Sequence, residues 1–313
     1  MIARPDVDTL LAGPLGQWLA GQATLREAAK KQSANRLFWA LLVVLPLAGA
    51  MWVLAPMEVE TKFWFTLLPA GAAWWWSQGP KRKAIKQVKT GINEAIAASL
   101  GLSYECDIEP DGVFEKAKNF GLMPSYDRAS FEDRWAGSFG AMPFSLHEAH
   151  LQERRGSGKN TRWVTVFQGP IMAFGFGRSF LGTTLVQRSG RYRKLFGGTK
   201  DSIVLDGLRL DYVDMVHPGF EDVFDVFSDD QVEARYLVHP VYIERLVALE
   251  QSFAGKNIRA LFSAGELVVA VENENMFESG SIEARDDRAL IERTIGQFAR
   301  MTDLADALNE RPR

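Results

Sequence analysis

The stretch LFWALLVVLPLAGAMWVLAP, residues 37–56, contains no charged side chain, and FWFTLLPAGAAWWWSQ, residues 63–78, follows it after a short polar loop. At about 1.5 Å per residue the first run forms roughly 30 Å of helix, which matches the hydrocarbon thickness of a bilayer. The second run is roughly 24 Å long, short but adequate beside a partner helix or where the bilayer thins. Because residues 57–62 allow only a tight reversal, we predict a transmembrane helical hairpin over residues 37–78.

Tryptophan and basic residues orient this hairpin. Six of the nine tryptophans lie in it, where interfacial aromatic belts are expected: Trp39, Trp52, Trp64, Trp74, Trp75 and Trp76. Basic residues flank the outer ends of the two spans: Arg26, Lys30, Lys31, Arg36, Lys81, Arg82, Lys83, Lys86 and Lys89. The loop between the spans has only Lys62, beside Glu58 and Glu60. The positive-inside bias therefore predicts that both termini are cytoplasmic. The first run starts too late and is too long for a signal peptide.

Charge and cysteine content limit the class of protein further. The chain of 313 residues has a net charge of −3, and residues 1–83 carry nine basic and five acidic side chains, which leaves −7 for residues 84–313. An acidic soluble part of this kind argues against nucleic-acid binding. The single cysteine, Cys106, excludes an internal disulfide and suits a reducing compartment.

Four regions follow from these patterns. Residues 1–36 form an N-terminal cytosolic segment, and three interpretations stay open for it: a surface-lying amphipathic helix, a docking helix, or disorder. Long helix in this segment is disfavoured by Pro5, Gly13, Pro14 and Gly16. After the hairpin, apolar residues at three-to-four spacing predict a helical stalk over residues 79–101, capped by Gly101. Residues 102–313 form the soluble domain.

The soluble domain has the pattern of an α+β fold with a mainly antiparallel sheet. Alternating apolar residues and Gly-rich turns predict strands around Met142–Leu146, Trp163–Phe167, Ile171–Phe176, Thr183–Gln187, Leu208–Met215, Val223–Phe227 and Ala234–Val238. A hairpin is expected around Ala264-Gly265. Helical patterns are found at Val113–Asn119, Pro240–Phe253 and Asp287–Asn309. Because the strands follow one another with short turns, we expect antiparallel pairing, with the last two helices covering one sheet face.

Three longer stretches carry a resemblance to a known family. They are FEDRWAGSFGAMPFSLHEAHL (131–151), RWVTVFQGPIMAFGFGRSFLGTTLV (162–186) and FEDVFDVFSDDQVEARYLVHPVYIERL (220–246). Over about residues 36–300 the chain resembles a bacterial family of uncharacterised membrane proteins that pair an N-terminal two-span hairpin with a cytosolic domain of unknown function. The resemblance implies a bacterial inner-membrane location and a complex with another membrane protein. The family has no assigned activity and no established catalytic residues, so the resemblance does not indicate a reaction.

The sequence His147-Glu148-Ala149-His150 invites comparison with zinc proteases. That motif needs two histidines four residues apart on a helix, so that both face one metal ion. Here the histidines are three apart in an alternating segment, so His147 faces one side of a strand while Glu148 and His150 face the other. We therefore interpret it as a strand with surface polar residues.

A Gly-rich basic run at residues 175–200 is the candidate ligand-binding site. Backbone amides beside glycines, together with arginines, hold phosphate or lipid headgroups in other proteins. The candidate side chains are Arg178, Arg188, Arg191, Arg193 and Lys194. The fixed spacing of a phosphate loop is missing, so turns carrying solvated charge are the simpler interpretation.

Other clusters point to structural roles. The acidic residues are Glu221, Asp222, Asp225, Asp229, Asp230 and Glu233. They lack the central glycine of a calcium loop, so we expect turn hydrogen bonds, and no metal or cofactor is predicted. Cys106 lies between Glu105 and Asp107, which disfavour its thiolate.

These patterns lead to a functional expectation. The chain is expected to be a membrane-anchored, non-catalytic binding or scaffold protein whose partners are the bilayer and another membrane protein. The alternative is an enzyme that acts on a lipid or phosphorylated ligand through residues 175–200. Whether the chain is an enzyme stays open at this level.

Overall fold

The computed structural model describes residues 6–139, 142–175, 180–194, 198–215, 223–252, 255–273 and 276–309. The chain divides into two compact units. The sheet unit comprises Met1–Pro5, Glu94–Glu278 and Arg293–Arg313, and the helical unit comprises Asp6–Asn93 and Ser279–Glu292. Each unit is described separately below.

The helical unit begins with α1 (Val7–Ala12) and continues into α2 (Pro14–Leu54), a helix of 41 residues. Pro14 occupies the first turn, where its missing N–H costs no intrahelical hydrogen bond. The buried residues of α2 recur at helical spacing: Leu15, Leu19, Arg26, Ala29 and Ser33. Of the three interpretations of residues 1–36, the structure therefore supports a docking helix, and the predicted boundary at residue 36 lies inside one continuous helix.

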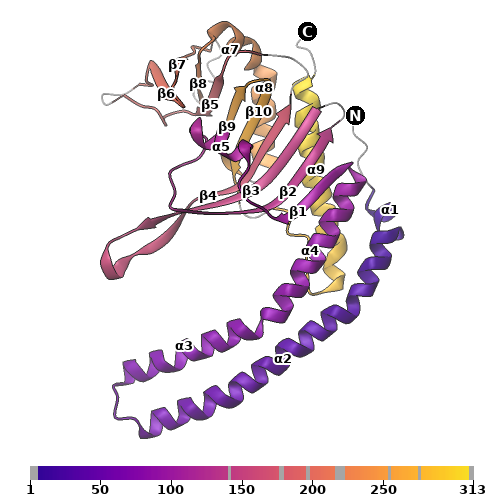
Figure 1. Ribbon diagram of the computed structural model, residues 1–313, viewed down its shortest axis with the longest axis vertical. Coiled ribbons are helices and arrows are strands. Elements are labelled where there is room, and N and C mark those ends of the chain that lie inside the picture. Colours follow the sequence, from indigo (N-terminus) through magenta and orange to yellow (C-terminus); the bar gives the residue numbers. More distant parts are fainter. Residues whose placement is uncertain are drawn as a thin grey trace. The chain divides into compact units, whose positions relative to one another are not determined.

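Helix α3 (Val59–Ser77) runs back along α2 (Figure 1). The indole Nε1 of Trp52 donates to Thr66 Oγ1 at 3.0 Å near the turn, and Ser33 Oγ donates to the carbonyl of Ser77 at 2.7 Å at the opposite end. These two bonds fix an antiparallel pairing of α2 with α3. Pro46 and Pro69 lie inside the two helices, as the sequence places them.

Helix α4 (Gly79–Ser99) ends before Gly101, whose φ of +71° is the left-handed conformation that a glycine cap supplies. Val88 and Ile92 of α4 are completely buried. A Cβ at Gly91 would lie 2.2 Å from the ring of Trp18, so glycine allows the close approach of α2. The sequence predicts a helical stalk over residues 79–101, and the structure has helix α4 there, with buried residues on one face.

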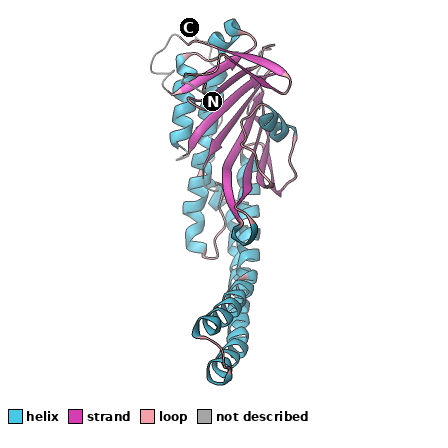
Figure 2. Cartoon of the chain, turned by 90° about the vertical axis from the view of Figure 1, so that its left-hand side faces the viewer, coloured by secondary structure: helices cyan, strands magenta, loops and turns pink. Residues whose placement is uncertain are grey.

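The sheet unit contains ten antiparallel strands in one twisted sheet (Figure 2). They are β1 (Leu102–Asp107), β2 (Arg128–Phe139), β3 (Met142–Arg155), β4 (Arg162–Gly175), β5 (Thr184–Arg188), β6 (Ser202–Leu205), β7 (Leu208–Tyr212), β8 (Phe224–Ser228), β9 (Lys256–Ser263) and β10 (Glu266–Glu272). Their order across the sheet is β1-β2-β3-β4-β10-β9-β5-β8-β7-β6. The predicted α+β class with antiparallel pairing is confirmed.

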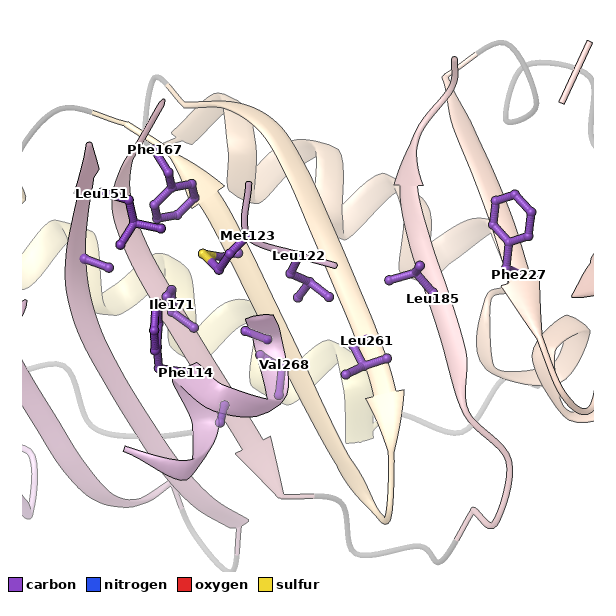
Figure 3. Packing of buried hydrophobic residues seen from close by; sticks show 14 of the residues in the cluster. Phe114, Leu122, Met123, Leu151, Phe167, Ile171, Leu185, Phe227, Leu261 and Val268 are labelled. Carbon is purple, nitrogen blue, oxygen red and sulfur yellow. The ribbon is translucent and has the colours of Figure 1, made fainter. Parts of the chain in front are cut away.

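Helices cover both faces of this sheet. On one face α5 (Gly112–Asn119) places Phe114 over a cluster that runs across the strands (Figure 3). The cluster includes Leu122, Met123, Leu151, Phe167, Ile171, Leu185, Phe227, Leu261 and Val268. On the other face Tyr242 of α8 (Pro240–Ser252) packs on Phe262, and Phe298 of α9 (Asp287–Asn309) packs on Trp135. Strand register puts Phe262 and Trp135 on the same face, so the two predicted covering helices share one face as expected.

Two sequence predictions are wrong in this unit. The expected strand Ala234–Val238 is helix α7 (Gln231–Leu237), because Asp230 accepts hydrogen bonds from the N–H groups of Val232 and Glu233 at 2.9 Å and caps a helix. No strand is predicted from the sequence before Met142, but residues 102–107 form β1. Short 3-10 turns occur at η1 (Gly158–Asn160) and η2 (Ala284–Asp286). The hairpin at Ala264-Gly265 is confirmed, with both residues at positive φ.

Candidate functional site

Of the five predicted ligand-binding residues, the structure describes four, and two of these four are paired with carboxylates. Arg178 lies outside the described residues. Arg188 ends β5, and its guanidinium pairs with the buried carboxylate of Glu250 and lies 4.7 Å from the ring centre of Phe224. Lys194 Nζ pairs with Asp201 Oδ1 at 2.7 Å. Two of the predicted cations are therefore neutralised within the protein.

We predict that Arg188→Gln lowers the free energy of unfolding by about 2 kcal/mol, because the Glu250 carboxylate would keep its burial and lose its cation. Chemical denaturation of the full-length protein in detergent measures this loss. Arg193→Gln is the matched control, because Arg193 is exposed, and its effect should stay within about 0.5 kcal/mol. Equal stability of the two variants would contradict a structural role for Arg188.

Arg191 has a different neighbourhood. Its Nη2 donates to the carbonyl of Met123 at 3.5 Å, and its charge helps to lower the pKa of Arg259. Burial is the main cause of that lowered pKa, and the Glu272 carboxylate opposes it. The Arg259 guanidinium donates to Glu272 and to the carbonyl of Leu122. An anionic ligand in this region would therefore meet Arg191 at the surface, next to a second, buried arginine.

Arg259 belongs to a buried polar row that the sequence analysis missed. Arg259, Gln187 and Asp225 occupy the neighbouring strands β9, β5 and β8 on the sheet face that α5 covers. Gln187 Nε2 donates to the carbonyl of Gly121 at 3.3 Å, while its Oε1 has no hydrogen-bond partner among the described residues. The alternation of side chains along a strand was the available signal, since Arg259 lies two residues before the apolar Leu261 and therefore on the same face of β9.

Carboxylates hold the Gly-rich segments in place. Asp225 accepts from the N–H of Gly190 at 3.0 Å and from Thr199 Oγ1 at 3.2 Å. Asp229 Oδ1 accepts from the N–H of Thr183 at 2.6 Å, and Glu233 Oε2 from the N–H of Gly182 at 2.7 Å. Asp225, Asp229 and Glu233 thus bind backbone amides 35, 46 and 51 residues away, and the local hydrogen bonds that the turn interpretation predicted are made by Asp230. Glu221 and Asp222 lie outside the described residues.

The His147-Glu148-Ala149-His150 segment forms part of β3, as expected, but two of its three polar side chains, those of His147 and Glu148, are buried. Glu148 is 3% exposed and its Oε1 accepts from the N–H of Met276 at 2.8 Å. His147 is 1% exposed, on the opposite face, between the rings of Phe114 and Phe131. Both of its ring nitrogens lack a hydrogen-bond partner among the described residues, and Asp111 Oδ2 lies 3.8 Å from Nδ1.

Burial lowers the pKa of His147; the Asp111 carboxylate opposes this shift and Arg134 adds to it. The unfolded chain therefore binds a proton near pH 6.5 that the folded chain binds only at lower pH, so stability falls as the pH drops below about 6.5. We predict a loss of up to about 1.4 kcal/mol per pH unit from this group. Unfolding of the wild type and His147→Leu at pH above and below this value measures it.

The comparison of the wild type with His147→Leu isolates the contribution of His147. Burial also lowers the pKa of His239, but His239 is present in both proteins and its contribution cancels. His147→Leu should remove part of the acid destabilisation. The same pH dependence in wild type and variant would contradict the assignment.

Three carboxylates meet at the β2 bulge. Oxygens of Glu132, Asp133 and Glu278 lie within 4.8 Å of one another. Asp133 has a φ of +54° and accepts a hydrogen bond from Tyr104 Oη at 2.5 Å. Acidic groups at such spacing are common without an ion, and the cluster does not by itself define a metal site.

Helices α2 and α3 carry an exposed apolar surface. An 18-residue window of α2 has a mean hydropathy of 2.3, and none of it is buried. Exposed large apolar side chains cover both helices, including Phe38, Leu42, Leu45, Leu47, Val53, Phe65, Leu68, Trp74 and Trp75. By length and composition α2 is long and apolar enough to cross a membrane, and among the described residues it is the one helix that meets this criterion. The second span therefore stays a prediction.

The fold and this surface define the class: an α+β protein with a long apolar N-terminal helix and a ten-stranded antiparallel sheet. Residues 165–310 match the model of a protein family described as "Protein of unknown function (DUF3137)", so the C-terminal part is a domain of unknown function. No curated protein matches the chain.

One solved structure that shows similarity is the crystal structure of the mycobacterial trehalose monomycolate transport factor A, TtfA. The identity is 14%, the match covers 74% of this chain and 100% of that chain, and the TM-score is 0.32. At this identity and TM-score, neither a shared fold nor a shared activity follows.

Proposed function

We propose that the chain is a membrane-anchored, non-catalytic binding or scaffold protein at the cytoplasmic face of a bacterial inner membrane. In this proposal α2 and α3 cross the bilayer as a hairpin, and both termini are cytoplasmic. The sheet unit then works in the cytoplasm in a complex with another membrane protein.

The observation that carries the anchor is the exposed apolar window of α2. A core helix of a soluble protein is mostly buried, whereas none of this window is. Leaving so many large apolar side chains in water is costly, at about 25 cal/mol per Å² of apolar surface, and a bilayer removes that cost. The Arg36 and Arg82 guanidiniums lie 4.9 and 4.6 Å from the ring centres of Trp76 and Trp75, an arrangement that suits a headgroup layer.

Support for a non-catalytic role comes from the Gly/Arg-rich region. Arg188 and Lys194 are paired with carboxylates, and Asp225 holds the loop through its backbone amide and a threonine hydroxyl. These contacts favour a structural role for the region. The enzyme alternative depends on Arg191 and Arg193, which are exposed.

The test uses full-length protein with a tag at each end. We expect the protein to resist carbonate extraction, both tags to be protease-accessible only in inside-out vesicles, and affinity purification to recover a membrane partner in stoichiometric amount. Carbonate release, or tags accessible from outside, would refute the anchor.

A double variant tests the enzyme alternative. Arg191→Gln/Arg193→Gln should leave partner recovery unchanged, and loss of a measured activity in this variant would instead favour the enzyme.

A further inference from the structure

Strands β3 and β4 continue as a two-stranded ribbon beyond their neighbours (Figure 1). Pairing of β2 with β3 reaches only Arg128↔Gln152, and β10 pairs with β4 only over residues 171–175, whereas β3 and β4 stay paired out to Arg155↔Arg162. We call residues 152–163 the ribbon tip. Among the described strands, only Gln152 of the tip also pairs with a neighbour, Arg128 of β2; beyond it the two sides pair only with each other.

The ribbon tip is basic on an acidic background. It carries four basic side chains, Arg154, Arg155, Lys159 and Arg162, against one acidic side chain, Glu153, although residues 84–313 together have a net charge of −7. Arg155 pairs with Glu153 at 2.8 Å. Arg154 and Arg162 are exposed, and within the described part of the chain no carboxylate pairs with the side chain of either. Asp127 Oδ2 accepts only from the backbone N–H of Arg154, at 2.6 Å. Positive charge is therefore available to a partner at this one end of the sheet.

An aromatic residue accompanies this charge. Trp163 is 43% exposed, and the guanidinium carbon of Arg128 lies 4.1 Å from its ring centre. Arg128 Nε donates to Gln152 Oε1 at 2.7 Å, which holds the guanidinium against the indole. A stacked guanidinium keeps other N–H groups free for an anion at the ring edge. Indole and guanidinium together are the combination found at membrane interfaces.

We propose that the ribbon tip docks on the anionic phospholipid surface of the membrane that anchors α2. This inference rests on the proposed anchor, which keeps the tip at high local concentration near that surface. Clustered Arg and Lys bind anionic headgroups through salt-sensitive attraction, and the indole inserts at headgroup level. The tip offers charge and one exposed indole but none of the clustered apolar anchors that form the centre of a protein–protein interface.

The single cysteine makes a direct measurement possible. Full-length Cys106→Ser protein receives a nitroxide at Ser157→Cys, an exposed position at the turn of the tip, and is reconstituted in nanodiscs. Discs of phosphatidylcholine alone are compared with discs that also contain phosphatidylglycerol. We expect phosphatidylglycerol to lower the collision rate of the label with an aqueous nickel chelate by about twofold or more, and added salt to restore it.

Matched variants separate charge from fold. Arg154→Gln/Arg155→Gln/Arg162→Gln should abolish this protection, and the corresponding Arg→Lys triple variant should keep it. The control replaces three exposed basic residues elsewhere in the sheet unit with Gln and should retain the protection; they are Arg209, Arg235 and Arg245. A label at Gln231→Cys, beside acidic Asp229 and Asp230, should be equally accessible in both kinds of disc.

The outcomes distinguish this inference from the anchor itself. Protein that resists carbonate but shows equal label accessibility in both discs overturns the docking and leaves the anchor intact. Protection that the triple Gln variant retains also overturns it. Protection that appears only in native membranes, and not in protein-free lipid with phosphatidylglycerol, overturns it in favour of a protein partner. Carbonate-extractable protein refutes the anchor on which the inference rests.

Discussion

Replacing both Leu42 and Leu45 with arginine should release the protein from membranes into the carbonate-soluble or aggregated fraction. The two side chains are 53% and 63% exposed and lie three residues apart, on one side of α2 within the apolar run. A Leu-to-Arg change near the centre of a spanning helix costs roughly 3 kcal/mol, so the pair costs about 6 kcal/mol of insertion free energy. Neither residue is needed for packing in the helical unit, because both are exposed there.

The measurement is the fraction of full-length protein that stays in the membrane pellet after a carbonate wash. Val232→Arg/Val241→Arg is the matched control, because these apolar residues of α7 and α8 are also exposed, at 79% and 51%. The control should stay in the pellet. If the Leu42/Leu45 variant remained fully membrane-bound and folded, α2 would not lie in the hydrocarbon, and the proposed anchor would be wrong.

The second large effect is expected in the helical unit, at the buried ion pair between Arg26 and Asp287. Arg26 Nη1 and Nη2 donate to the two carboxylate oxygens of Asp287 at 2.9 and 2.7 Å, and the two residues are 2% and 6% exposed. Arg26→Met would leave a buried carboxylate without its cation, although Asp287 keeps a favourable place in the first turn of α9. We expect a loss of about 3–5 kcal/mol in the free energy of unfolding.

Urea unfolding in detergent measures this loss, and a double-mutant cycle tests its origin. Arg26→Met/Asp287→Leu should cost much less than the sum of the two single variants, since no unpaired charge remains. Arg288→Met is the control. Arg288 pairs with Asp8 at 2.7 Å, but its side chain is 54% exposed, so its loss should cost much less than the loss of Arg26. Equal effects of the two arginines would contradict the role of burial.

Local chemistry made several elements predictable. The closing helix Asp287–Asn309, helix α8 from Pro240 and the β9–β10 hairpin follow from residue spacing, a proline at the first turn and a two-residue turn. The prediction failed at α7, where the apolar residues around Tyr236 resemble a strand and the helix depends on the capping side chain of Asp230. It also failed at β1, whose partner β2 supplies the pairing from over 20 residues away.

The candidate site shows the same division. The composition of the sequence indicated a basic, Gly-rich region. The order of charged residues along the chain did not indicate that Arg188 forms an ion pair with Glu250, which is 62 residues away. Likewise the basic ribbon tip is visible in the sequence as a list of charges. Only the strand pairing indicates that it extends beyond β2 and β10, with Arg128 of another strand stacked on Trp163.

The sequence by itself determined the apolar helix, the α+β class and most of the periodic elements, because these depend on hydrophobic spacing and on turn and capping residues close together in the chain. Tertiary structure alone decided which charges are buried and paired, which face of α4 is covered, and where His147 and Arg259 lie. The physical reason is that burial and pairing are set by residues far apart in the chain: Arg26 meets Asp287 across 261 positions.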